Sequence, residues 1–385
     1  MDHPEHIVIG GGVVGAAAAR SLAARGRRVL LVEQFARGHD RGSSHGASRI
    51  FRQGYTAPEY VAMTSRALEL WRTLESESGE QLLTLTGAVD HGRPETVDAI
   101  TDALAAAGIP AERLTPDEAT ARWPGLVFEG SVLTHASAGR IRSDRAVEAL
   151  LDRAAADGAE LWFETPVSGV VVDADGATVT LADGRSVTTP SVVVAVGSWT
   201  HPLVGAVLDA RGAALPEVRV TEEQPAHFRT TLPDEAWPSV VHYPLDVAGT
   251  GGSDSVYGLC TPGQGVKVGF HGTGTEVSAD HRTSAPDAAQ LAALVAYVER
   301  FVPGVSVADP EPISCLYDTT PDEDFVLDRS GPVTVATGFS GHGFKFAPLL
   351  GDVLADLAML PADAAPGAPV RSLPGRARER FAFRS

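Results

Sequence analysis

The N-terminal part of the chain places short apolar runs on both sides of a glycine-rich segment. Residues 7–9 and 29–32 are wholly apolar, and residues 16–24 between them are rich in alanine. Short apolar runs without polar alternation are typical of strands buried in a parallel sheet, whereas alanine favours helix. Gly26 is suited to end that helix. The pattern predicts a strand, a helix and a second strand.

The rest of the chain changes between helical and strand-like periodicity. Further helices are expected at residues 60–80, 97–107, 145–156, 285–301 and 349–360. Further strands are expected at residues 160–163, 167–172, 177–181, 192–196 and 333–336, and much of residues 217–313 is strand-like. The tail, residues 361–385, is rich in Pro, Ala and Arg and is expected to run as a strap over the surface. Because strand-rich blocks lie between α/β blocks, we predict two interleaved domains.

Composition narrows the classes of partner. The chain has 385 residues, 44% of them hydrophobic, which is enough to bury a large core. Its net charge of −18 argues against nucleic acid or an anionic membrane as partner. The sequence shows neither a secretory signal nor an apolar stretch near the ~18 residues that span a bilayer. Two cysteines, Cys260 and Cys315, make no disulfide framework. We therefore expect a soluble cytoplasmic protein without a metal site.

The glycine-rich segment has the spacing of a dinucleotide-binding turn. Residues 10–15 read G-G-G-V-V-G and fit G-x-G-x-x-G between the first strand and the first helix. The three glycines allow a tight turn, close approach of a pyrophosphate, and close packing of helix on strand. Glu33 ends the second strand, where a carboxylate can bind a ribose, which favours FAD or NAD over NADP. The candidate nucleotide-binding residues are Gly10, Gly12, Val13, Val14, Gly15, Glu33 and Gln34.

Four longer motifs indicate which nucleotide is bound. They are residues 42–52, 267–271, 315–317 and 338–345. Together they resemble the D-amino acid oxidase-like flavoproteins, in particular the branch of monomeric sarcosine oxidase and N-methyltryptophan oxidase. The resemblance extends over nearly the whole chain, and the two glycine-rich stretches are long enough to be specific. It implies FAD as the cofactor.

The resemblance also implies the architecture. The fold class is α/β, with a Rossmann-like FAD-binding domain interleaved with a substrate domain built on a large antiparallel sheet. The FAD-binding domain is expected to comprise residues 1–81, 141–216 and 314–385. The substrate domain is expected to comprise residues 82–140 and 217–313. A monomer is implied by the same resemblance.

Cys315 is the candidate for a covalent bond to the flavin. In the family a cysteine shortly before a tyrosine is bonded to the 8α-methyl group, and Cys315-Leu316-Tyr317 matches that motif. An arbitrary cysteine is more often a buried core residue. Cys260 has no such match and is expected to be structural.

Four cations match functional positions of the family. Arg52 and Lys345 match a clamp for the substrate carboxylate, and the planar fork of an arginine suits that group. Lys267 matches the lysine that activates oxygen, because a fixed cation stabilises the superoxide anion formed first. Arg49 matches an arginine against the flavin. A cationic pocket should lower the pKa of the substrate ammonium and favour the reactive neutral amine.

Other positions are implied by the same matches. His45 and His271 match histidines of the active site, although an isolated histidine is more often structural and both roles stay open. Tyr257 and Tyr317 match tyrosines near the substrate, and Gly341 a backbone contact to substrate and flavin. The remaining cofactor contacts implied are Ser43, Ser44, Arg49, Val167, Gly197, Trp199, Gly341, Gly343, Phe344 and Lys345.

The expected activity is oxidation of a small secondary amino acid such as sarcosine, with an imine and hydrogen peroxide as products. Asp318, Phe270 and Ser48 depart from the residues of sarcosine oxidases, as does segment 240–256, so the substrate stays open. The alternatives are a cyclic imino acid oxidase for proline or pipecolate, an Amadori-compound oxidase, and a tailoring enzyme of secondary metabolism. A flavin dehydrogenase and a flavoprotein without catalysis are further alternatives; Lys267 argues against the first.

Overall fold

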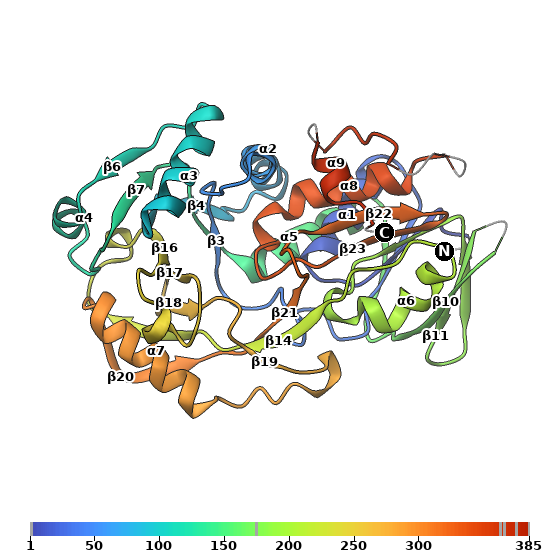
Figure 1. Ribbon diagram of the computed structural model, residues 1–385. Coiled ribbons are helices and arrows are strands. Elements are labelled where there is room, and N and C mark those ends of the chain that lie inside the picture. The colour runs from blue at the N-terminus through green and yellow to red at the C-terminus, as the bar shows by residue number, and fades with distance from the viewer. Residues whose placement is uncertain (1–2, 174–175, 362–363, 365–366, 374–375, 384–385) are drawn as a thin grey trace.

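A computed structural model describes residues 3–173, 176–361, 364, 367–373 and 376–383 (Figure 1). Its central element is a six-stranded sheet. The strand order is β22 (Val326–Ser330), β23 (Val333–Thr337), β13 (Ser191–Val194), β1 (His6–Ile9), β2 (Val29–Val32) and β9 (Glu160–Trp162). All neighbours are parallel except β22 and β23. The predicted strand–helix–strand unit is confirmed, with α1 (Val13–Ala24) between β1 and β2.

Helices α1 and α8 (Ala347–Ala358) pack directly on one face of this sheet. Helix α5 (Ser143–Ala156) packs on α1, and α2 (Pro58–Ser78) packs on α5 and α8. Because β1, β2 and β13 are buried along their whole length, their side chains can be apolar on both faces. The opposite face is covered by the small sheet of β10 (Val167–Val172), β11 (Ala177–Leu181) and β12 (Ser186–Thr189), together with α6 (Thr200–Asp209).

A second, larger sheet stands beside the first (Figure 1). Its order is β20 (Val305–Pro312), β15 (Ala226–Thr230), β18 (Gly265–Phe270), β17 (Val256–Thr261), β16 (Ser239–Tyr243), β5 (Ala88–Gly92), β7 (Ser131–His135) and β6 (Glu112–Leu114). The sheet is antiparallel as expected, except that β16 and β5 run parallel. Helix α7 (Ala288–Phe301) packs on one face, and α3 (Pro94–Ala106) packs on β5 and β7.

The α/β fold class is confirmed, and the sheets are distributed as two interleaved domains require. Strands of the six-stranded sheet come only from the ranges assigned to FAD binding, and strands of the eight-stranded sheet only from the other two ranges. Two small sheets mix strands from both. One contains β19 (Thr275–Glu276), β14 (Arg219–Glu223) and β21 (Cys315–Thr319), and the other β3 (Arg49–Phe51), β8 (Gly139–Ile141) and β4 (Leu83–Leu85). The exact boundaries stay a prediction.

Three features differ from the expectations. Helix α6 and the short helix α4 (Pro116–Arg122) were not predicted, although Thr115 and Glu118 form a capping box that marks the start of α4. The tail is more than a strap over the surface. Val370, Leu373, Ala377 and Phe381 are buried in the hydrophobic core on the α8 side of the six-stranded sheet. Only Ala377 lies in a helix; Phe381 is tied to the sheet because its carbonyl oxygen accepts from the Leu327 amide of β22 at 2.7 Å. Within the described residues, no helix has both the length and the apolar character of a membrane span.

Candidate active site

A cleft of about 1080 Å³ extends from the carboxyl ends of β1, β2 and β13 to the eight-stranded sheet. Such a position, outside the carboxyl ends of parallel strands, is where open α/β sheets bind ligands. Every residue predicted for the site lines this cleft, with one exception, Gly15. A Cβ on Gly15 would collide with the carbonyl oxygen of Gly10, so this glycine serves the close packing of α1 on β1. That is the part the motif assigns to its third glycine.

The start of α1 forms one end of the cleft. Gly12 caps the helix, and Gly10 adopts φ +103°, a left-handed conformation that favours glycine. The amide of Val13 donates to Ser44 Oγ at 3.0 Å, which brings the segment around residue 44 to the helix N-terminus. The positive end of the helix dipole therefore faces the cleft, as an anion such as a pyrophosphate requires.

Glu33 lies beside the glycine turn. Its carboxylate accepts hydrogen bonds from the amides of Gly11 at 2.6 Å and Phe35 at 2.9 Å. Burial would raise the pKa of Glu33, but the contact with His39 and these amide bonds outweigh burial and lower it. The glycine turn, the helix N-terminus and an ionised carboxylate at the end of β2 together fit the adenosine half of a dinucleotide such as FAD.

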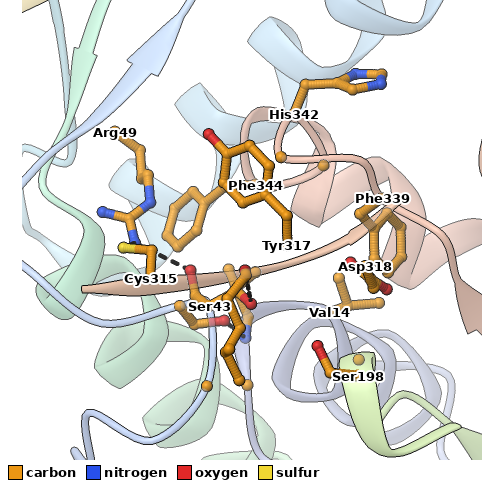
Figure 2. A pocket seen from close by; sticks show the side chains of 18 of the residues that line it. Val14, Ser43, Arg49, Ser198, Cys315, Tyr317, Asp318, Phe339, His342 and Phe344 are labelled. Atoms are coloured by element: carbon orange, nitrogen blue, oxygen red, sulfur yellow. Dashed lines mark hydrogen bonds between the residues drawn. The ribbon is translucent and has the colours of Figure 1, made fainter. Parts of the chain in front are cut away.

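Cys315 lies beside the positively charged side chain of Arg49 (Figure 2). Its Sγ is 3.8 Å from Arg49 Nη2 and 3.9 Å from His45 Nε2. Burial would raise the pKa of this thiol, but the charge of Arg49, the His45 contact and the charge of Lys267 lower it to about 6. The thiolate is the nucleophilic form of cysteine. The sulfur is therefore chemically suited to bond a carbon atom of a cofactor.

Arg49 is held by backbone carbonyl groups, so its position beside Cys315 is fixed. Its guanidinium donates to the carbonyl oxygens of Ser43 and His45, at 2.9 and 2.6 Å, and of Ser48 at 2.9 Å. Ser43 Oγ in turn donates to the carbonyl oxygen of Leu316, next to Cys315. These bonds join the segment before β3 to β21, as the dashed line from Ser43 in Figure 2 illustrates.

Lys267 projects from β18 and is only 3% exposed. Its Nζ donates to the carbonyl oxygen of Ser48 at 2.6 Å. Burial, and then the charge of Arg49, lowers the pKa of Lys267 to about 7. An ammonium that has lost most of its water acts on a nearby charge more strongly than a solvated one. This is the environment that a role in oxygen activation requires.

Arg52 and Lys345 line the same cleft from two separate segments. Among the described residues, Arg52 Nη1 is buried and has no hydrogen-bond partner; the nearest carboxylate oxygen, Asp90 Oδ1, is 3.8 Å away. Lys345 is 3% exposed, and its Nζ donates to Tyr55 Oη at 2.9 Å and to the carbonyl oxygen of His342 at 2.7 Å. An unpartnered guanidinium nitrogen and a buried ammonium suit an anionic ligand group.

Asp90, which the sequence did not single out, is a buried neighbour of Arg52. It is fully buried on β5, accepts a hydrogen bond from Tyr243 Oη at 3.4 Å, and lies 3.6 Å from His135 Nε2. Asp90 is therefore the counter-charge that accompanies Arg52 below the cleft. The only signal in the sequence is one acidic residue, followed by a histidine, in a short strand, which is too weak to assign a partner.

We expect Asp90→Asn to destabilise the protein, because it leaves the largely buried Arg52 without a counter-charge. Loss of one partner of a buried pair costs about 3 kcal/mol. Urea denaturation should show this as a lower free energy of unfolding. The control is Glu311→Gln, which removes the exposed ion pair between Arg229 and Glu311 and should barely move the transition. Equal midpoints for Asp90→Asn and the wild type would contradict the role of Asp90.

The remaining predicted side chains surround the middle of the cleft. His271 is neutral, because burial and then the charges of Arg52 and Lys345 lower its pKa to about 4. Its ring lies 5.4 Å from that of Tyr317. Burial raises the pKa of both Tyr257 and Tyr317, so both hydroxyls stay protonated. His45 contacts Cys315 instead, so the two histidines have different surroundings.

Asp318 also lines the cleft, and its side chain holds the glycine-rich loop 338–343. Its Oδ2 accepts from the Gly338 amide at 2.9 Å and from Thr337 Oγ1 at 3.3 Å, and its carbonyl oxygen accepts from the Ser340 amide. Burial raises the pKa of this carboxyl to about 6. The departure at this position therefore has a structural role in a loop where Gly338, Ser340 and Gly341 all adopt positive φ. Gly341 is required because a Cβ there would enter the Tyr317 ring.

Comparisons with known proteins agree with this geometry. A family model described as FAD dependent oxidoreductase matches residues 5–357. The monomeric sarcosine oxidase of Streptomyces avermitilis is 35% identical over 364 residues, which are 92% of this chain and 93% of that protein. The N-methyl-L-tryptophan oxidase of Salmonella heidelberg is 30% identical over 92% of this chain and 94% of its own. Among solved structures, the chain is similar to the open form of NikD, an unusual amino acid oxidase essential for nikkomycin biosynthesis. The two are 26% identical with a TM-score of 0.84, and the match covers 100% of this chain and 98% of NikD.

Proposed function

The chain belongs to the FAD dependent oxidoreductase family and is a flavin-dependent amine oxidase, and we propose that its substrate is a small secondary amino acid such as sarcosine. The observation that carries the proposal is that Arg52 and Lys345 line the same cleft as Cys315 and Lys267. One end of the cleft can thus hold a carboxylate while the amine of the same molecule lies toward the flavin. The relatives named for sarcosine and N-methyl-L-tryptophan support a substrate of this type.

Each residue of the cleft would have a separate role in this reaction. When bound, FAD would accept the two electrons of the amine and pass them to oxygen. Arg52 and Lys345 hold the carboxylate, which fixes the orientation of the carbon that is oxidised. The cationic cleft favours the neutral amine, whose lone pair assists loss of the C–H hydrogen. Lys267 stabilises the anion that forms when oxygen is reduced. The products are an imine, which water converts to an aldehyde and an amine, and hydrogen peroxide.

We further propose that Cys315 anchors the flavin through an 8α-S-cysteinyl thioether. The low pKa of Cys315 and its position against Arg49 support this proposal. Forming a thioether from a thiol and a methyl group removes two hydrogen atoms, and oxygen, which the enzyme already uses, is their acceptor. The backbone around Gly341 and Gly343 and the side chain of Phe344, which line the same part of the cleft, would complete the binding surface for the ring system.

A second substrate class is a larger or cyclic imino acid, as for a tailoring enzyme. The likeness over the whole chain to NikD, an amino acid oxidase essential for nikkomycin biosynthesis, favours the tailoring role. Tyr243, Asp254 and Ser255, from the segment that departs from sarcosine oxidases, line the cleft and are the residues that would distinguish the two classes.

A substrate panel tests the proposal. Sarcosine, N-methyl amino acids, proline and pipecolate would be added to the purified holoenzyme, and bleaching of the flavin band would be followed together with hydrogen peroxide. We expect bleaching without oxygen, and peroxide with it, for at least one N-methyl amino acid. Response to cyclic imino acids alone would favour the second class. Bleaching without peroxide would indicate a dehydrogenase, and no bleaching by any amine of the panel would reject the proposal.

We also propose that the protein is a cytoplasmic monomer. Its two cysteines are both buried and unpaired, which fits a reducing compartment, and the name of its sarcosine oxidase relatives includes the word monomeric. Cell fractionation and light scattering of the pure protein test the two statements separately.

A further inference from the structure

Tyr55 contacts both cations of the proposed carboxylate clamp, through two different parts of its side chain. Its hydroxyl oxygen accepts a hydrogen bond from Lys345 Nζ at 2.9 Å. Its ring lies against the Arg52 guanidinium, with 4.5 Å between Arg52 Cζ and the ring centroid, where the electrons of the ring attract a cation. One half-buried side chain thereby joins two residues that lie far apart in the sequence.

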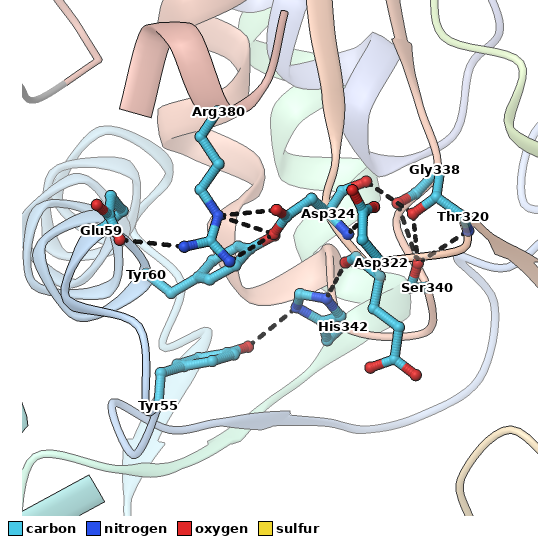
Figure 3. A network of polar contacts seen from close by, with 11 residues as sticks. Tyr55, Glu59, Tyr60, Thr320, Asp322, Asp324, Gly338, Ser340, His342 and Arg380 are labelled. Atoms are coloured by element: carbon cyan, nitrogen blue, oxygen red, sulfur yellow. Dashed lines mark hydrogen bonds and ion pairs between the residues drawn. The ribbon is translucent and has the colours of Figure 1, made fainter. Parts of the chain in front are cut away.

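The direction of the hydrogen bonds around this hydroxyl follows from the chemistry of its neighbours. The carbonyl oxygen of Glu323 can only accept, so His342 Nε2, 3.2 Å away, carries the hydrogen. Burial, and then the charge of Lys345, holds the pKa of His342 well below its usual value, so the ring is neutral and Nδ1 accepts. Tyr55 Oη lies 3.2 Å from Nδ1 (Figure 3) and therefore donates to it. The oxygen lone pairs of Tyr55 therefore face Lys345.

The ring of Tyr55 is held from behind (Figure 3). Tyr60 stacks on it with 5.1 Å between ring centroids and 23° between ring planes. Tyr60 Oη donates to Asp324 at 3.0 Å, and Asp324 also accepts from Arg380 Nε, which belongs to α9 (Ala377–Arg380). These contacts leave the Tyr55 ring little freedom to turn away from Arg52.

The N–H groups of Lys345 and Arg52 that have no hydrogen-bond partner indicate the function of the contacts around Tyr55. Burial and then the charge of Arg52 lower the pKa of Lys345 well below its usual value, and the charge of a bound carboxylate raises it again. In the ammonium form Lys345 has three N–H groups and uses one for Tyr55 and one for the carbonyl oxygen of His342. One N–H group is left for a ligand. Arg52 Nη1 has no hydrogen-bond partner among the described residues, and its ion-pair partner Asp90 is 3.8 Å away. We propose that Tyr55 is a substrate-positioning residue, which fixes Arg52 and Lys345 so that their free donors receive one carboxylate. The inference rests on the proposed function, because it concerns the same clamp.

Titration with acetate and benzoate tests this without turnover. The dissociation constant is read from the change in flavin absorbance of the holoenzyme, since both ligands carry a carboxylate and no amine. We expect Tyr55→Phe to weaken binding about tenfold, because it removes the hydroxyl, and with it the bonds to Lys345 and His342, but keeps the ring against Arg52. Tyr55→Leu should weaken it further, because the ring below Arg52 is lost as well. With an amine that the enzyme oxidises, Tyr55→Phe should raise KM and leave the limiting rate of flavin reduction nearly unchanged.

The matched control is Tyr297→Phe. Tyr297 Oη also hydrogen-bonds a histidine, His242 Nδ1 at 2.8 Å, but it packs under the eight-stranded sheet and does not line the cleft. This variant removes the same kind of bond and should bind carboxylates like the wild type. Thermal unfolding of each variant shows whether a change in affinity accompanies a loss of folded protein.

A double-mutant cycle separates positioning from a general structural effect. Once Lys345→Met has removed the ammonium, Tyr55→Phe should cost almost nothing more, because its partner is gone. An additive loss in the double variant, or unchanged affinity in Tyr55→Phe alone, would overturn the inference. Equal losses in Tyr55→Phe and Tyr55→Leu would overturn the part assigned to the ring.

The same titration distinguishes failure of the inference from failure of the proposed function. A wild-type protein that binds carboxylates but oxidises no amine of the panel would refute the proposed substrate and leave the Tyr55 comparison valid. A wild-type protein that binds neither acetate nor benzoate has no carboxylate clamp, and both proposals would then be wrong.

Discussion

Replacing Lys267 by methionine should slow the reaction of the reduced enzyme with oxygen by about a thousandfold. A cation about 4 Å from a forming anion contributes roughly 4 kcal/mol at an effective dielectric constant of about 20, and that free energy corresponds to a factor of about a thousand in rate. The buried position of Lys267 supports a dielectric constant well below that of water. Methionine has a similar length without the charge. Stopped-flow mixing of reduced enzyme with oxygen measures the rate directly.

The anaerobic half of the reaction is the control for this variant. Flavin reduction by the amine should change much less, because the substrate contacts assigned to Arg52 and Lys345 are intact. A variant in which reduction slows while reoxidation stays fast would show that Lys267 serves substrate binding. Lys267→Arg, which keeps the charge, should recover part of the oxygen reaction.

The oxygen reaction should also depend on pH. Because the pKa of Lys267 is lowered to about 7, its charge is complete in acidic solution and is lost as the pH rises through neutrality. The rate of reoxidation should therefore fall above about pH 7, and Lys267→Met should show no such fall. A wild-type rate that increases across this range would contradict the assignment.

The second large effect concerns the flavin itself. Wild-type protein precipitated with acid should keep its yellow colour in the pellet, whereas Cys315→Ala should release all of it to the supernatant. The reason is that only a covalent bond survives unfolding. Cys260 is the matched control, because it is also a buried, unpaired cysteine, but burial and Asp234 raise its pKa to about 12 and keep it protonated. Cys260→Ala should retain the colour.

Release of the flavin from the wild-type protein would refute the thioether while leaving FAD binding intact. Retention of the colour by Cys315→Ala would mean that another residue forms the bond. Mass spectrometry of the flavin peptide decides between these outcomes, since the modified residue carries the mass of the cofactor.

Much of this fold and site could be read from local sequence. The glycine turn before α1 follows from steric rules that act within a few residues, and the motifs around Cys315 and Lys345 place whole groups of side chains in the cleft at once. The neighbours of those side chains could not be read in this way. Asp90 lies near Arg52 only because β5 pairs with β16 and lies below the cleft. Tyr55 and Lys345 are in contact although they are 290 residues apart in the sequence. Contacts of this kind depend on strand pairing and helix packing, which no motif encodes.

The order of strands in the six-stranded sheet has a consequence for synthesis in the cell. On the ribosome, β1 and β2 emerge first, but β23, which completes the sheet beside β13, is made only after nearly the whole chain. The apolar surface of the early strands therefore stays exposed until β23 is synthesised. Sheets whose neighbouring strands lie far apart in the sequence also form slowly. We expect nascent chains to depend on chaperones until the last strands arrive. Because β21 carries Cys315 and also emerges late, the proposed thioether can form only on a nearly finished polypeptide.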